Sequence, residues 1–155
     1  MNMKFLENKI PPPLVAIIIA ACMWGLSQFT DNIMLSATVK YSFVFTFVST
    51  GIFFALAGVI SFRLAKTTVN PLKPDTASAL VTSGIYQFSR NPMYVGFVGF
   101  LFAWTSFLGS VWGIGFIVLY IAFIQRFQIV PEERALTKIF NGEFEDYKNQ
   151  VRPWL

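Results

Sequence analysis

The sequence predicts an all-α integral membrane protein with four transmembrane helices. Hydrophobic residues make up 55% of its 155 positions and charged residues 13%, against roughly 45–50% and about 25% in soluble domains. Its mean hydropathy is +0.58, and its apolar runs approach or exceed the roughly 20 residues that cross a bilayer. We therefore expect one membrane domain over residues 1–155, with spans at about 12–29, 41–62, 92–108 and 111–130.

The first span is predicted to begin within the three prolines at 11–13, because proline is tolerated in the first turn of a helix. The chain then stays apolar to Phe29 except for Ser27 and Gln28. A cleavable signal peptide is disfavoured, since no small-x-small cleavage pattern follows and three further apolar runs do. The second span, Tyr41 to Phe62, has 22 residues without a charge.

Residues 63–90 form the longest polar segment, in which Pro71 and Pro74 prevent a continuous helix. Loops of this length inside compact domains tend to be functional. The next charge-free run, Pro92 to Ile124, has 33 residues and is too long for one membrane crossing. We expect it to fold back at Gly109-Ser110 as a helical hairpin of the third and fourth spans.

The tail after Pro131 changes character. Apolar side chains recur at helical spacing between Leu136 and Tyr147, which predicts a short amphipathic cytoplasmic helix. Asn141-Gly142 is a break within it. The final segment 151–155 contains Trp154, which we expect to return to the membrane interface.

Cation counting predicts the orientation. With four spans, the amino terminus, the 63–90 segment and the tail share one side, which carries 11 of the 12 Lys and Arg residues, while the other side carries Lys40. Cationic loops remain cytoplasmic, so we expect a bacterial inner-membrane protein with both termini cytoplasmic. The net charge of +4 then indicates membrane lipids as partners and gives no argument for nucleic acid.

Composition also excludes several chemistries. The chain has no histidine and one cysteine, Cys22. Histidine-dependent nucleophile systems and nearly every zinc site are therefore excluded, and no disulfide framework is possible. We expect no metal.

Two polar clusters remain as candidates, Ser89 to Gly96 and Pro131 to Arg134, which contains the pair Glu132-Glu133. Each has an ordinary explanation: Arg90 as a snorkelling cation, Tyr94 as an interfacial aromatic, the glutamates as acids at a helix start. The hairpin nevertheless returns both clusters to the same membrane face, where polar groups are costly unless paired or functional. The two carboxylates, grouped with Arg90 and Arg126, suit a zwitterionic ligand.

Four stretches carry a family resemblance: Gly84-Ile85-Tyr86, Arg90-Asn91-Pro92-Met93-Tyr94-Val95-Gly96, Glu132-Glu133, and Phe140-Asn141-Gly142-Glu143-Phe144-Glu145-Asp146-Tyr147. In this order, around a helical hairpin, they resemble the isoprenylcysteine carboxyl methyltransferase and phospholipid methyltransferase superfamily of integral membrane enzymes. The resemblance covers about residues 70–155. Asn91 stands where the family usually has histidine, and asparagine cannot take a proton.

The resemblance implies transfer of the methyl group of S-adenosyl-L-methionine to a small lipophilic or lipid-like acceptor. It places the cofactor in the part formed by about residues 70–155, with Glu132 or Glu133 receiving its amino group. Carried over by position, the catalytic residues are Arg126 and Glu132, and the cofactor-binding residues are Arg90, Asn91, Pro92, Tyr94, Gly96 and Glu133.

The acceptor stays open between a carboxylate, a thiol and an amine. A carboxylate needs no base and Arg126 would orient it, so we favour carboxyl methyl transfer; a thiol or amine must lose a proton, for which Glu132 is the nearest candidate. Two alternative functions are a membrane reductase of the sterol reductase type that uses NADPH, and a non-catalytic membrane scaffold.

Overall fold

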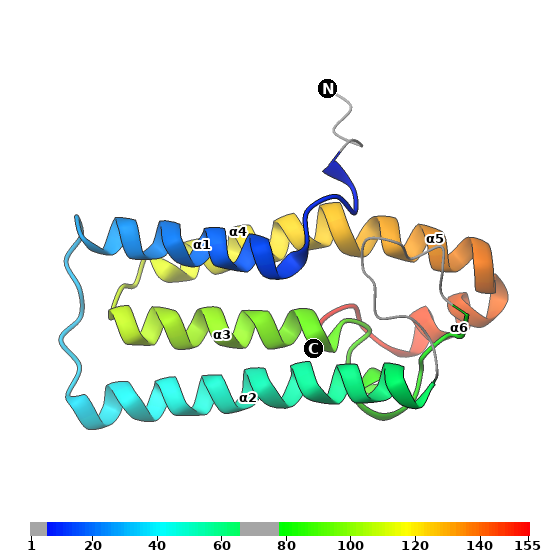
Figure 1. Ribbon diagram of the computed structural model, residues 1–155, viewed down its shortest axis with the longest axis horizontal. Helices are drawn as coiled ribbons and strands as arrows, with labels where there is room; N and C mark the ends of the chain where they lie inside the picture. The colour runs from blue at the N-terminus through cyan, green and yellow to red at the C-terminus, as the bar shows by residue number, and fades with distance from the viewer. Residues whose placement is uncertain (1–5, 66–77) are drawn as a thin grey trace.

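The computed structural model describes residues 6–65 and 78–155 (Figure 1). The central part of the predicted 63–90 loop, with Pro71 and Pro74, lies outside these ranges. Within them the chain is helical and contains no strand. Its elements are α1 (Pro12–Ser27), α2 (Ala37–Leu64), a 3-10 turn (Gly84–Gln87), α3 (Pro92–Leu108), α4 (Gly113–Ile124), a π-helical segment (Gln125–Ile129), α5 (Val130–Phe140) and α6 (Gly142–Gln150).

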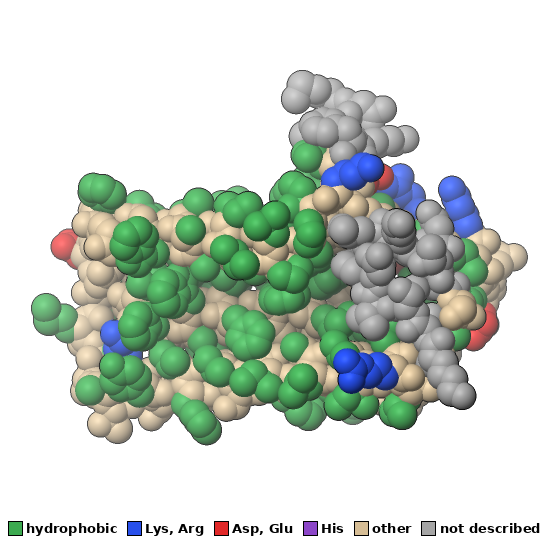
Figure 2. All heavy atoms as spheres, in the orientation of Figure 1, with side chains coloured by type: hydrophobic (Ala, Val, Ile, Leu, Met, Phe, Trp, Pro, Cys, Tyr) green, Lys and Arg blue, Asp and Glu red, His purple; other side chains and the backbone are tan. Residues whose placement is uncertain are grey.

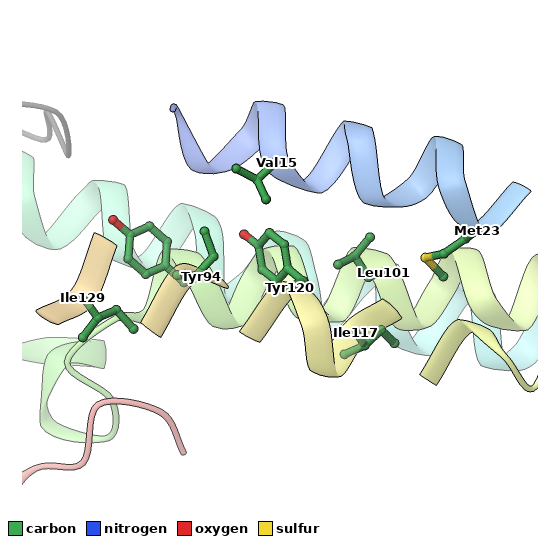
Figure 3. Packing of buried hydrophobic residues seen from close by; sticks show 8 residues of the cluster. Val15, Met23, Tyr94, Leu101, Ile117, Tyr120 and Ile129 are labelled. Atoms are coloured by element: carbon green, nitrogen blue, oxygen red, sulfur yellow. The ribbon is translucent and has the colours of Figure 1, made fainter. Parts of the chain in front are cut away.

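Helix α3 is the central helix of the bundle. It lies between α2 on one side and the pair α1 and α4 on the other (Figure 1). The main apolar core is formed by buried side chains from α1, α3, α4 and the π-helical segment, among them Val15, Leu101, Ile117 and Tyr120 (Figure 3). Helix α3 is therefore packed on two sides.

Helices α2 and α3 pack unusually close through glycine. A Cβ atom built on Gly51 would lie 2.9 Å from the Gly96 carbonyl oxygen, and one built on Gly96 would lie 2.9 Å from the Gly51 oxygen. Small residues allow such backbone approach in helical membrane proteins, where dispersion contacts rather than the hydrophobic effect hold helices together. This contact fixes the position of α3 against α2.

The hairpin between α3 and α4 turns where the sequence predicted. Gly109 caps α3 in the left-handed conformation, with φ of 68°, which favours glycine. Its carbonyl oxygen also accepts a hydrogen bond of 2.7 Å from the Ile33 N–H in the α1–α2 connection. The two turns at this end of the bundle are thereby joined.

The prediction that the fourth span ends near residue 130, with a separate helix after Pro131, is wrong in detail. The helix runs without interruption from Gly113 to Phe140. Proline at 131 has no N–H for the carbonyl four residues earlier, which belongs to Phe127. The π-helical segment absorbs this irregularity, and the Phe127 oxygen accepts instead from the Asn8 N–H at 3.0 Å.

In the part of the chain that the structure describes, two helices are long and apolar enough to cross a membrane, Ala37–Leu64 and Gly113–Phe140, each with 28 residues. Helices α1 and α3 are apolar but shorter. Figure 2 shows hydrophobic side chains over the helices and Lys and Arg side chains gathered at the end that carries α5 and the N-terminal segment. We call this end of the bundle the α5 end.

We expect Gly51→Ala to destabilise the protein by about 1–3 kcal/mol, because the added methyl group must displace the α3 backbone. Gly115→Ala is the matched control, since nothing lies within 4 Å of a Cβ atom there. Thermal unfolding of both variants in one detergent measures the difference. Equal midpoints would show that α2 and α3 are not held by this contact.

Candidate functional site

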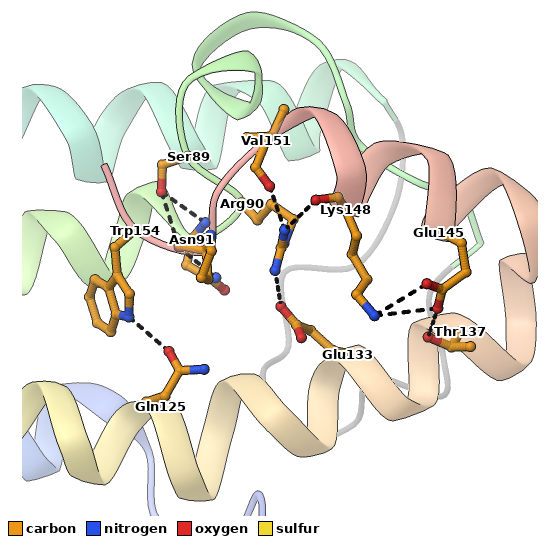
Figure 4. A network of polar contacts seen from close by, with 11 residues as sticks. Ser89, Arg90, Asn91, Gln125, Glu133, Thr137, Glu145, Lys148, Val151 and Trp154 are labelled. Atoms are coloured by element: carbon orange, nitrogen blue, oxygen red, sulfur yellow. Dashed lines mark hydrogen bonds and ion pairs between the residues drawn. The ribbon is translucent and has the colours of Figure 1, made fainter.

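Arg90 is the most heavily engaged polar residue at the α5 end (Figure 4). Its Nη2 lies 2.5 Å from Glu133 Oε1, while its Nη1 donates to the carbonyl oxygens of Lys148, at 3.2 Å, and Val151. The Arg90 and Glu133 side chains are 10% and 21% exposed. The guanidinium therefore joins the start of α3, helix α5 and the C-terminal tail.

The neighbours of Arg90 hold the same tail. Asn91 Nδ2 donates to the Pro153 oxygen at 2.9 Å, and the buried Ser89 hydroxyl donates to the same oxygen at 3.4 Å. The next residue, Trp154, donates from Nε1 to Gln125 Oε1 at 2.8 Å (Figure 4). Trp154 thus contacts the bundle, and its place at the membrane interface stays a prediction.

Tyr94 reaches the second glutamate. Its hydroxyl donates to Glu132 Oε1 at 2.6 Å, and its side chain is 6% exposed. The predicted meeting of the two motifs is therefore confirmed, since Arg90 and Tyr94 contact Glu133 and Glu132 respectively. Among the described residues no cation lies within ion-pair distance of Glu132.

Pro92 and Gly96 are placed by packing. Pro92 is fully buried at the first turn of α3, where proline is tolerated because that N–H has no helical partner. Gly96 faces Gly51 and Ala55 of α2 rather than the glutamates. Its position is explained by the α2–α3 contact, and its cofactor role stays a prediction.

Arg126 is not part of the cluster around Glu132. Its Nη1 lies 3.2 Å from Glu7 Oε1, and its side chain is 51% exposed. The sequence grouped Arg126 with Arg90 because both lie near the same membrane face. The structure brings Arg126 together with Arg134 instead, because both contact Glu7.

A small, mainly aromatic cluster joins α6 to the 3-10 turn. Tyr147 of α6 donates its hydroxyl to the Tyr86 carbonyl oxygen at 2.6 Å, and both rings pack with Val81 and Phe144. Burial raises the pKa of the Tyr147 hydroxyl well above its usual value, although Arg90 opposes the rise. The hydroxyl therefore remains a donor, and α6 stays attached to the 3-10 turn.

Sequence reasoning missed the residues that act through the tail. Ser89 was part of the predicted cluster without an assigned role. Gln125 and the carbonyl groups of Val151 and Pro153 were missed, because backbone carbonyls leave no signature in a sequence. Trp154 was the one available signal. The 3-10 turn that carries Tyr86 was singled out only as part of a motif.

The arrangement has a definite charge pattern. A carboxylate offers about four acceptor positions, and in the described part of the chain Glu132 uses one of them, for Tyr94. Arg90 Nε is a buried donor with no partner there. A free acceptor and a free donor therefore lie on the two motifs that meet. Within residues 6–65 and 78–155 no group of side chains could hold a metal ion.

The fold and the composition are those of a helical integral membrane protein with a polar cluster at one end of the bundle. A family model described as phospholipid methyltransferase matches residues 39–143, more than half of the chain. The chain therefore belongs to this family, within the superfamily of integral membrane methyltransferases.

Two curated proteins are similar to it. An uncharacterized protein of Haemophilus influenzae is 38% identical over 63 residues, which are 41% of this chain and all of that protein. Protein-S-isoprenylcysteine O-methyltransferase of Saccharomyces cerevisiae is 34% identical over 82 residues, 51% of this chain and 33% of the yeast protein. No solved structure matches significantly. Neither the reductase nor the scaffold interpretation is favoured by these comparisons.

We expect Arg90→Gln to lower the free energy of unfolding by about 1.5–3 kcal/mol, the usual range for hydrogen bonds to a charged group. It removes the ion pair with Glu133 and a donor to the tail. Arg63→Gln is the control, because Arg63 is exposed. Denaturant unfolding measures stability, and protease cleavage after α6 reports release of the tail. Equal stability and equal cleavage of the two variants would show that Arg90 does not hold the tail against α5.

Proposed function

We propose that the protein is an S-adenosyl-L-methionine-dependent methyltransferase that acts at the membrane–cytosol interface on a small lipophilic or lipid-like acceptor. The observation that carries the proposal is the pairing of the two motifs, with Arg90 on Glu133 and Tyr94 on Glu132. Membership of a methyltransferase family supports the reaction class.

The residues fit a zwitterionic, net cationic methyl donor. Glu132, Glu133 and Arg90 together carry one excess negative charge in their ordinary ionised forms. The donor carries a sulfonium, an ammonium and a carboxylate, one excess positive charge. Glu132 would accept from its ammonium, and the free Nε of Arg90 would donate to its carboxylate. Complementary charge is expected to hold such a ligand beside lipid.

The chain needs to do little chemistry beyond positioning. When bound, the cofactor supplies a methyl group on a positively charged sulfur. Tyr94 fixes Glu132 through its 2.6 Å hydrogen bond, and the tail held by Arg90, Ser89 and Asn91 limits access of water. A carboxylate acceptor needs no base, which is why we favour carboxyl methyl transfer. For a thiol or amine acceptor, Glu132 would take the proton.

We further propose a four-span topology in a bacterial inner membrane, with the α5 end in the cytoplasm. Helices α1 and α3 are shorter than α2, yet all three run along the long axis of the same bundle (Figure 1). The opposite end carries Lys40, whose Nζ lies 4.5 Å from the centre of the Phe107 ring. The concentration of cations at the α5 end supports this orientation.

Cofactor binding tests the proposal directly. We expect S-adenosylhomocysteine to bind the detergent-purified protein, and Glu132→Gln to weaken binding by about 1.5–3 kcal/mol, because a charged hydrogen bond is lost. Glu143→Gln, at an exposed position of α6, is the control and should bind normally. Isothermal titration calorimetry gives both affinities. Binding of NADPH alone would overturn the choice of reaction.

Site-directed labelling tests the topology. In a Cys22→Ser background, Met34→Cys and Glu143→Cys introduce exposed thiols at opposite ends of the bundle. A membrane-impermeant maleimide should label position 34 in intact bacterial cells and position 143 only after permeabilisation. Labelling of both positions in intact cells would exclude this topology.

A further inference from the structure

A second charged cluster lies apart from Glu132 and Glu133. The Glu7 carboxylate bridges two arginines, with Oε1 3.2 Å from Arg126 Nη1 and Oε2 accepting from Arg134 Nη2. The Glu7 side chain is 14% exposed, whereas the arginine side chains are 51% and 48% exposed. The arginines thus face the surroundings, and a single carboxylate lies between them.

Electrostatics favour the charged form of Glu7. Burial alone would raise the pKa of its carboxyl, but hydrogen bonds from Arg134 and Arg126 outweigh this effect, and the resulting pKa lies below the usual value. The arginine pair is therefore a place where an oxyanion is stabilised as an anion.

The π-helical segment creates the pair. Arg126 and Arg134 are eight positions apart, and at about 100° per residue they would point about 80° apart on a regular α-helix. One extra residue in a π turn makes eight positions equivalent to about seven, which places the two side chains within about 20° on one face. Arg126 lies inside this segment and Arg134 follows it.

The segment that carries Glu7, residues 6–10, makes an incomplete set of hydrogen bonds with the π-helical segment. Asn8 N–H donates to the Phe127 oxygen at 3.0 Å, and Gln128 Nε2 donates to the Ile10 oxygen at 2.7 Å. Asn8 Oδ1 and Gln128 Oε1, however, are buried without a partner among the described residues. Unpaired buried acceptors cost free energy, so withdrawal of the segment would return both to water.

We propose that Arg126 and Arg134 form a binding site for the phosphate or carboxylate group of an anionic lipid-like molecule, and that Glu7 competes for it. Guanidinium groups match the geometry of either oxyanion. The pair lies at the cationic α5 end of a membrane bundle, where anionic headgroups concentrate. The source of this oxyanion is the headgroup of an anionic membrane lipid, with free phosphate as the competing source. Its binding requires no methyl transfer, so the inference survives failure of the proposed reaction.

The test compares lipid binding to full-length variants in a neutral detergent by native mass spectrometry. We expect Glu7→Gln to bind phosphatidylglycerol about fivefold more tightly than the unaltered protein, the upper range for an exposed ion pair. Adding Arg134→Ala to this variant should abolish the gain. Two variants serve as controls. Glu143→Gln removes the same charge as Glu7→Gln at a distant position and should not tighten binding. Lys138→Ala removes a cation from α5, the helix that carries Arg134, and the gain should persist when it is added to Glu7→Gln.

Further ligands separate the sources of the anion. Phosphatidylcholine, a zwitterionic lipid, should show no gain in Glu7→Gln, and inorganic phosphate should bind more weakly than phosphatidylglycerol if the lipid is the ligand. An equal gain in phosphatidylglycerol affinity in Glu7→Gln and Glu143→Gln would contradict the proposed site, because the gain would then reflect general charge attraction. If Glu7→Gln does not fold, Arg134→Ala alone decides, because it must bind phosphatidylglycerol more weakly than Lys138→Ala.

Discussion

The contact between Arg90 and Glu133 is the constraint on which the α5 end depends. One guanidinium joins the residues that lead into α3, helix α5, and carbonyl oxygens in the last turn of α6 and directly after it. Because the pair is only 10% and 21% exposed, neither charge can be left alone without a large desolvation cost. The tail is therefore part of the site, although it is the last segment of the chain.

The second determinant is Pro131. Its missing N–H would leave the Phe127 carbonyl unpaired in a regular helix, and the chain answers with a π-helical segment and a contact from Asn8. The extra residue in the π turn also changes the direction in which the side chains after it point. Tyr120 and Glu132, twelve positions apart, would point about 120° apart on a regular α-helix but come within about 20° across a single π turn. Pro131 thus helps to aim Glu132 toward α3.

Much of the fold followed from patterns that are local in the sequence. The bounds of α3 and the turn at Gly109 were predicted because a charge-free run of 33 residues must fold back and glycine favours the turn. The meeting of Arg90 and Tyr94 with the glutamates followed from that hairpin. The π-helical segment could not be predicted, since Pro131 indicated a helix boundary. Arg126 was grouped with Arg90 because both lie near the same membrane face; its pairing with Arg134 through Glu7 could not be predicted, since a regular helix would point the two arginines apart.

The two adjacent glutamates have different surroundings because neighbours on an α-helix point about 100° apart. Glu133 faces Arg90 and the tail, where its charge is compensated within the chain. Glu132 faces Tyr94, which supplies one hydrogen bond but no charge. A glutamate that is held in place and has no described cation beside it is the one that we propose for the cationic ligand, whereas its neighbour maintains the surrounding structure. In that proposal, ligand binding and structural support fall to adjacent residues of one helix.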